Sequence, residues 1–86
     1  MTTEERNQMN IQIEYTDTFG GEANYSWVKR FNLTLPNTVP DRTIKRMAKE
    51  LCGISGSRGR WEDLGDVMQF KPYSSNTVLF ITFEPE

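Results

Sequence analysis

Histidine is absent from this 86-residue chain, cysteine occurs only at position 52, and no apolar run approaches the roughly 20 residues that cross a bilayer. Without histidine there is no Ser–His or Cys–His nucleophile pair and no imidazole ligand for zinc. One cysteine forms neither an intramolecular disulfide nor a thiolate metal cluster, so Cys52 is expected in the core. We therefore expect a cytoplasmic protein that is not an enzyme, with no cofactor, no metal and no membrane contact.

Carboxylates and glycines are the remaining candidates for chemistry. Acidic residues gather in the 62–66 turn, but "EDLGD" lacks the ligand spacing of a calcium loop, and such residues usually solvate a turn. The glycines of "GISGSRG", residues 53–59, follow the predicted helix, whereas a phosphate-binding loop precedes one. We interpret them as a helix end and a connector.

The size and charge of the chain fit a single small domain. Hydrophobic residues make up 36% and the net charge is −2, which favours neither a disordered chain nor a general polyanion binder. Residues 1–8 have almost no apolar side chains and are expected to be a flexible tail, so that the domain covers residues 9–86.

The first half of the domain predicts a hairpin. Apolar and polar residues alternate over 9–15, the pattern of a half-buried strand, and an extended run follows over 25–35. Phe19 to Asn24 is expected to form a loop of about six residues, longer than a tight hairpin needs. Strict alternation puts Lys29 on the core face and Val28 outside, so a bulge at Val28 to Arg30 is expected to restore the phase.

A helix follows Pro36. Thr38 is the expected N-cap, with Pro40 in the first turn, and Gly53 is the expected stop. The apolar residues between them fall at i, i+3, i+4 and i+7, which places them on one stripe. These residues are Ile44, Met47, Ala48 and Leu51.

The last third predicts three more strands, giving the order β-β-α-β-β-β. This is an α+β fold with one antiparallel sheet and one helix on one face. The final run, residues 77–84, is apolar enough to be central in the sheet or covered on both faces. One helix covers one face, so Val78 and Phe80, or their counterparts, are expected to be lightly exposed or buried in a homodimer, and the chain to be a monomer or such a dimer.

Basic residues cluster along the helix and the connector after it. These are Arg42, Lys45, Arg46, Lys49, Arg58 and Arg60. They can be a solvated surface or a phosphate-contacting, nucleic-acid-binding surface. No aromatic residue is interleaved with the helical residues of this set, so the pattern gives no support for base stacking there.

Three runs carry a resemblance that covers nearly the whole chain beyond the tail: "IEYTDTFGGEANYSWVKR", "DRTIKRMAKELCGISGSRGRWEDLGD" and "NTVLFITFE". The chain resembles small proteins of unknown function encoded by phages, prophages and other mobile elements. The resemblance brings no catalytic residues. It implies a compact module that binds and inhibits a host protein complex, by analogy with anti-CRISPR and anti-restriction proteins.

The first of these runs also contains the candidate protein-binding residues. Phe19, Tyr25 and Trp27 are the expected aromatic anchors, although Tyr25 and Trp27 can equally be core, and Asp17 and Glu22 are the expected charged rim. The hypothesis is contact with a host protein through this corner, and the alternative is nucleic-acid binding through the basic face of the helix.

Overall fold

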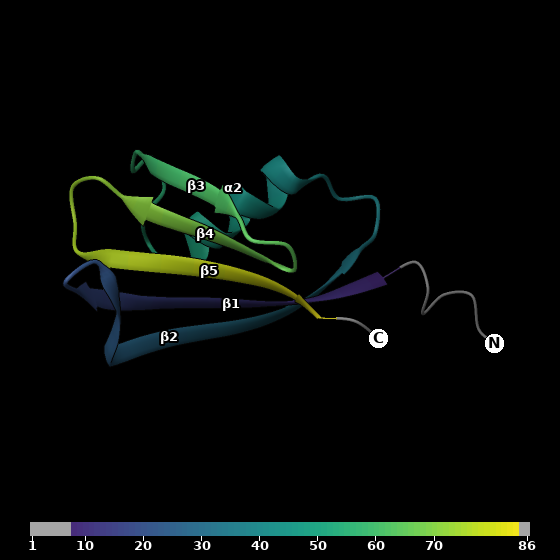
Figure 1. Cartoon of the computed structure of the whole chain (residues 1–86). Coiled ribbons are helices and arrows are strands. Elements are labelled where there is room, and N and C mark those ends of the chain that lie inside the picture. Colours follow the sequence, from purple (N-terminus) through teal and green to yellow (C-terminus); the bar gives the residue numbers. More distant parts are fainter. Residues whose placement is uncertain (1–7, 85–86) are drawn as a thin grey trace.

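A single antiparallel sheet and one helix make up the computed structural model of the chain, which describes residues 8–84 (Figure 1). The elements are β1 (Gln8–Phe19), β2 (Glu22–Pro36), α2 (Asp41–Leu51), β3 (Gly59–Asp63), β4 (Val67–Pro72) and β5 (Thr77–Glu84). The predicted α+β class and the order β-β-α-β-β-β are confirmed. The expected tail, residues 1–8, lies outside the described residues except for Gln8, which already belongs to β1.

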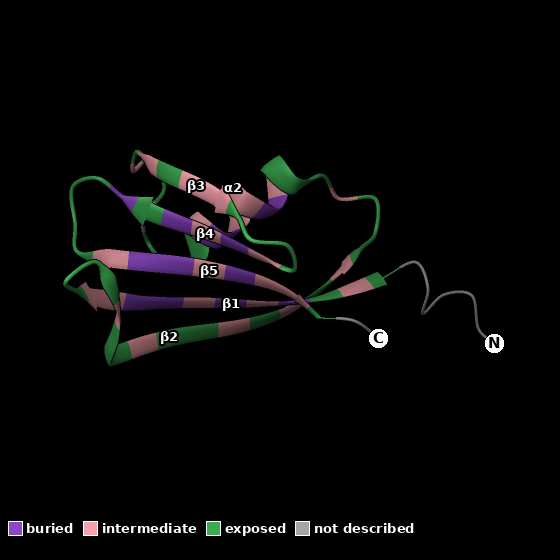
Figure 2. Cartoon of the chain, viewed as in Figure 1, coloured by how far each residue is buried: buried purple, intermediate pink, exposed green. Residues whose placement is uncertain are grey.

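The last strand in the chain occupies the middle of the sheet. The spatial order is β2-β1-β5-β4-β3, with every neighbouring pair antiparallel. The apolar run of residues 77–84 therefore forms the central strand, as the sequence predicted. Figure 2 shows that burial is concentrated on the three middle strands, while β2 and β3 form the exposed edges.

The core lies between α2 and one face of the sheet. Alternate residues of β1, β4 and β5 face the helix because side chains along a strand point to opposite faces. The buried apolar side chains of the sheet are Ile11, Ile13, Tyr15, Met68, Phe70, Leu79 and Ile81 on this face, and those of the helical segment are Ile44, Ala48 and Cys52. Partly buried side chains from β2 and β3, including Phe31 and Trp61, extend the core toward both edges.

The helix differs from its prediction at its start and in its buried stripe. Pro40 occupies the N-cap position without a side-chain hydrogen bond, and Thr38 lies in the turn before it. Gly53, with φ +75°, donates to Glu50 O, and the next amide, of Ile54, donates to Lys49 O, which forms the expected glycine stop as a Schellman motif. Leu51, expected in the buried stripe, is 40% exposed.

The irregularity of the hairpin lies nearer its tip than predicted. The β1–β2 register runs unbroken from Gln8 opposite Pro36 to Thr16 opposite Val28, and then shifts between Thr16 and Thr18. Residues 24–27 therefore form the bulge, and Lys29 stays opposite Tyr15 on the core-facing side. The expected six-residue loop is instead the tight turn Gly20–Gly21, where both residues have positive φ.

The tip of the hairpin covers part of the sheet face opposite the helix. Lys71, whose side chain is on that face, donates its amino group to Gly21 O at 2.9 Å, across the intervening β5. Figure 1 shows the beginning of β2 crossing over β1 near the tip. Val78 is buried within its own chain, contrary to the expectation that it is lightly exposed or buried against a partner chain, whereas Phe80 remains half-buried.

Candidate functional site

The first candidate site is the hairpin corner, defined as residues 17–27, and its bulge is built around Asp17. This carboxylate accepts hydrogen bonds from the Ser26 amide at 2.9 Å, the Ser26 hydroxyl at 2.6 Å and the Asn24 side-chain amide at 3.0 Å. These bonds replace the ladder bonds that residues 24–27 lack. One side chain of β1 thus fixes the path of the bulged segment of β2.

The same hydrogen bonds hold the pKa of Asp17 well below its usual range. The Ser26 hydroxyl contributes most and the Asn24 amide next, because both stabilise the ionised form, and partial burial opposes them. Asp17 is therefore a carboxylate at neutral pH, with both oxygens engaged by its own chain. It positions the corner and is not the free charged rim that the sequence suggested.

Tyr25 is the non-glycine residue with positive φ among residues 8–84, at 57°. Its hydroxyl donates to Glu14 Oε1 at 2.7 Å, and Arg30 Nε donates to the other oxygen of Glu14 at 2.7 Å. The hydrogen bond to Glu14 raises the pKa of Tyr25, with a smaller contribution from burial. This network holds Tyr25 in a backbone conformation that L-residues seldom adopt, while its side chain stays 47% exposed.

The remaining corner residues present aromatic surface. Phe19 is 80% exposed at the tip, and its partner in the strand register, Glu22, is exposed as well. Trp27 is 41% exposed and contacts the Tyr15 ring edge-on at 5.3 Å between centroids, while its carbonyl accepts from the Thr16 hydroxyl at 2.6 Å. The structure thus brings the five predicted residues to one corner, with Phe19 free of the core and Trp27 only partly packed on it.

The second candidate site is a basic groove between α2 and β3, of about 480 Å³. Its lining residues are Arg42, Lys45, Arg46, Lys49, Glu50, Ser55, Gly56 and Trp61. Lys45 Nζ lies 4.9 Å from the Trp61 ring centroid, and Lys49 Nζ lies 4.7 Å from that of Phe70 while donating to Ser57 O at 2.6 Å. Four cations and one indole therefore share one hollow.

The groove lacks two of the basic residues predicted for this surface and includes one aromatic residue that was not predicted. Arg60 pairs with Glu62 at 3.6 Å, and the alternation of β3 puts both on the opposite face from Trp61. Arg58 is exposed in the connector and does not line the groove. Trp61, in contrast, was missed, because it follows the helix by ten residues and only the packing of β3 beside α2 brings it there.

No protein-family model, curated protein or solved structure matches this chain. No relative therefore brings a ligand, a partner or a catalytic residue to the corner or to the groove. The case for each surface rests on its own side chains.

Cys52 offers no nucleophile to either surface. It is buried in the core, and that burial raises the pKa of its thiol to about 11. Within residues 8–84, no group of three or more Cys, Asp or Glu side chains is placed to hold a metal ion. The one helix in this part of the chain is too short and too polar to cross a membrane.

Proposed function

We propose that this chain is a protein-binding module that contacts its partner through the hairpin corner. The observation that carries the proposal is the set of hydrogen bonds from Ser26 to the Asp17 carboxylate. These bonds fix the bulge at the corner, where Phe19, Tyr25 and Trp27 remain substantially exposed. Aromatic side chains are the usual anchors of protein interfaces. An ordered loop loses less conformational entropy on binding than a mobile one, so a fixed corner favours affinity.

The resemblance to phage and prophage proteins extends the proposal to the identity of the partner. On this view the partner is a host protein complex in the bacterial cytoplasm, of the kind that defends against mobile elements. The module acts by occupying a surface of that complex, because its chain has no histidine and its only cysteine is buried. Inhibition by contact requires only the exposed aromatic surface.

A matched pair of variants tests the proposal. A tagged chain is expressed in a bacterial host, and captured proteins are quantified by mass spectrometry for the native chain and for Phe19→Ser. We expect the native chain to retain one partner in stoichiometric amount. Since removal of an interface anchor costs about 2 kcal/mol or more, Phe19→Ser should reduce capture by more than about tenfold.

Leu64→Ser is the control for this experiment. Leu64 is 58% exposed in the turn between β3 and β4, which the strand register places at the other end of the sheet from the corner. Leu64→Ser thus removes an exposed apolar side chain, as Phe19→Ser does, and the amount of captured partner should be unchanged. Absence of a stoichiometric partner, or equal loss with both variants, would show that the corner is not the contact surface.

A further inference from the structure

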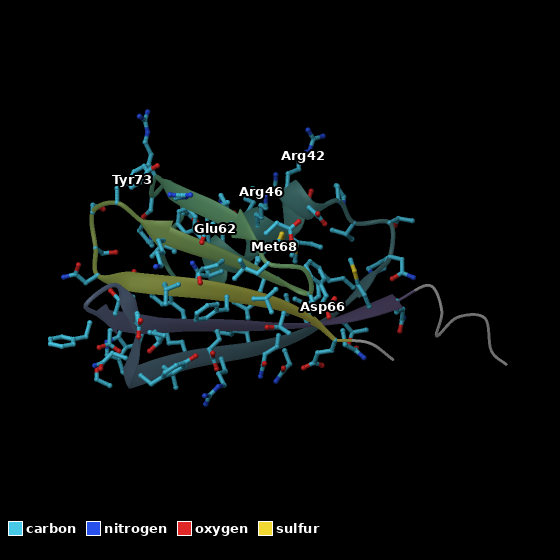
Figure 3. All side chains as sticks on the ribbon, viewed as in Figure 1. Arg42, Arg46, Glu62, Asp66, Met68 and Tyr73 are labelled. Carbon is cyan, nitrogen blue, oxygen red and sulfur yellow. The ribbon has the colours of Figure 1, made fainter. Side chains whose placement is uncertain are left out.

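The protein-binding proposal makes no use of the basic groove between α2 and β3. Along α2, Arg42, Lys45, Arg46 and Lys49 follow one another at i, i+3, i+4 and i+7, so they share one helical face. No salt bridge involves any of the four within the part of the chain that the structure describes. In Figure 3, Arg42 and Arg46 extend from the helix away from the body of the sheet. Two planar guanidinium groups are thus available for bidentate hydrogen bonding to an oxyanion such as phosphate.

Trp61 adds an aromatic surface to these charges. Its ring contacts Phe70, with centroids 4.7 Å apart and planes inclined at 38°, and the amino group of Lys45 lies over the ring. Lys45 is a flexible side chain on a partly exposed ring, and a cation in such a position is held less tightly than a stacked base. A planar ligand can therefore displace Lys45 from Trp61, and the freed ammonium can then pair with the ligand's phosphate.

Carboxylates bound the groove and limit the length of its ligand. Glu50 lines the groove itself. An adjoining smaller hollow, which shares Lys45 and Trp61, is lined in part by the acidic residues Asp41 and Asp63. A long polyanion that crossed both hollows would meet all of these like charges, whereas a single phosphate and a single ring in the groove would meet fewer of them. The groove volume of about 480 Å³ is also in the range of small-molecule sites.

We propose that this groove binds a single nucleoside phosphate, with its phosphate between Arg42 and Arg46 and its base on Trp61. The same chemistry is present in a free nucleotide and at the end of a nucleic-acid strand. The acidic boundaries favour the free nucleotide.

Fluorescence titration of Trp61 tests this site. The chain has two tryptophans, so Trp27→Phe leaves Trp61 as the only indole. Adenosine 5′-monophosphate should quench its emission saturably. Because both halves of the ligand contribute, this nucleotide should bind at least about tenfold more tightly than adenosine or inorganic phosphate alone. A long single-stranded DNA should bind no more than about tenfold more tightly than the nucleotide at the same ionic strength.

Variants in the same background separate the site from nonspecific attraction. Arg46→Gln, at an exposed position that leaves the core intact, should weaken nucleotide binding by about tenfold. Trp61→Leu, followed by amide chemical shifts instead of emission, should weaken it similarly. Arg60→Gln is the control. It removes the same charge from the residue next to Trp61, on the opposite face of β3, and binding should stay within about twofold.

Each contrary result overturns the proposal. No saturable quenching, or equal binding of the nucleotide and its two halves, would remove the site. Equal weakening by Arg46→Gln and Arg60→Gln would reduce it to general electrostatic attraction. Much tighter binding of the DNA strand would replace the nucleotide with a nucleic acid as the ligand.

Discussion

Asp17 orders four residues of β2, numbers 24–27, that have no partners in the β1 ladder. Its carboxylate accepts both a backbone and a side-chain hydrogen bond from Ser26, and these bonds depend on its negative charge for their full strength. The fold at the corner is therefore coupled to the ionisation of one side chain. This coupling makes the stability of the corner depend on pH.

The Asp17→Asn variant measures that coupling. Because the pKa of Asp17 is lowered in the folded chain, ionised Asp17 contributes stability above its unfolded pKa of about 4, and this contribution is lost as the pH falls below that value. Urea unfolding should therefore find Asp17→Asn less stable than the native chain at pH 6, with a smaller difference at pH 3. At pH 6 the Ser26 amide should also exchange faster in the variant.

A difference that stays the same at both pH values would show that the charge of Asp17 is unimportant and that only its shape matters. Asp63 is a useful comparison, since its carboxylate accepts one hydrogen bond, from the Gly65 amide, whereas the Asp17 carboxylate accepts bonds from both Asn24 and Ser26. Asp63→Asn should leave the pH dependence of unfolding close to that of the native chain.

Sequence patterns drew attention to the aromatic residues of the corner but left open whether Tyr25 and Trp27 belong to the core, and they did not predict the role of Asp17. Phe19, Tyr25 and Trp27 stand out by type beside two glycines, and all three are exposed. Asp17 was predicted as a rim because an acidic residue near a turn is usually solvated. Its partners, Asn24 and Ser26, lie seven and nine residues further along the chain, and only the bulge brings them to it.

At the scale of elements, the helix and the burial of Ile44 and Ala48 were predicted correctly, but the N-cap at Thr38 and the burial of Leu51 were not. The apolar spacing centres the stripe between Ile44 and Leu51, whereas Cys52 is buried and Leu51 is 40% exposed. Lys45 and Lys49 explain the rotation, since their amino groups lie over the rings of Trp61 and Phe70 and their aliphatic stems cover apolar surface. A pattern that counts lysine only as polar cannot find this orientation.

The beginning of β3 requires glycine at position 59 because there is no space for a side chain. A Cβ on Gly59 would meet Lys71 O and would lie 2.7 Å from Phe70 Cζ, so the close approach of β3 to β4 excludes a side chain there. We expect Gly59→Ala to destabilise the fold by about 1–3 kcal/mol through overpacking, measured by chemical denaturation.

Arg60→Ala, the neighbouring residue on the same strand, gives the comparison for Gly59→Ala. It removes a solvent-exposed ion pair with Glu62, and pairs of this kind contribute about 0–1 kcal/mol. A loss for Gly59→Ala no larger than that of Arg60→Ala would mean that β3 moves away from β4 at little cost.

At the scale of the whole molecule, the placement of β5 between β1 and β4 creates both surfaces. It brings the hairpin tip near Lys71 of β4 and leaves β3 as the outer strand beside α2. The apolar run over residues 77–84 predicted the central strand, because a strand with apolar residues on both sides needs cover on both faces. Neither the folded tip nor the groove was predictable, because each depends on contacts between segments far apart in the chain.

The folded tip also bears on whether two copies associate through the sheet face opposite the helix. Val78 is already buried by its own chain, and Phe80 lies between Glu14 of β1 and Gln69 of β4 in the register. One half-buried phenylalanine with polar neighbours is far from the roughly 800 Å² per partner of a stable interface. We therefore predict that light scattering gives a mass near the 10.0 kDa of one chain, and that Phe80→Asp leaves this mass unchanged. A doubled mass that Phe80→Asp returns to that of one chain would instead establish a dimer through this face, because a buried charge without a partner opposes association.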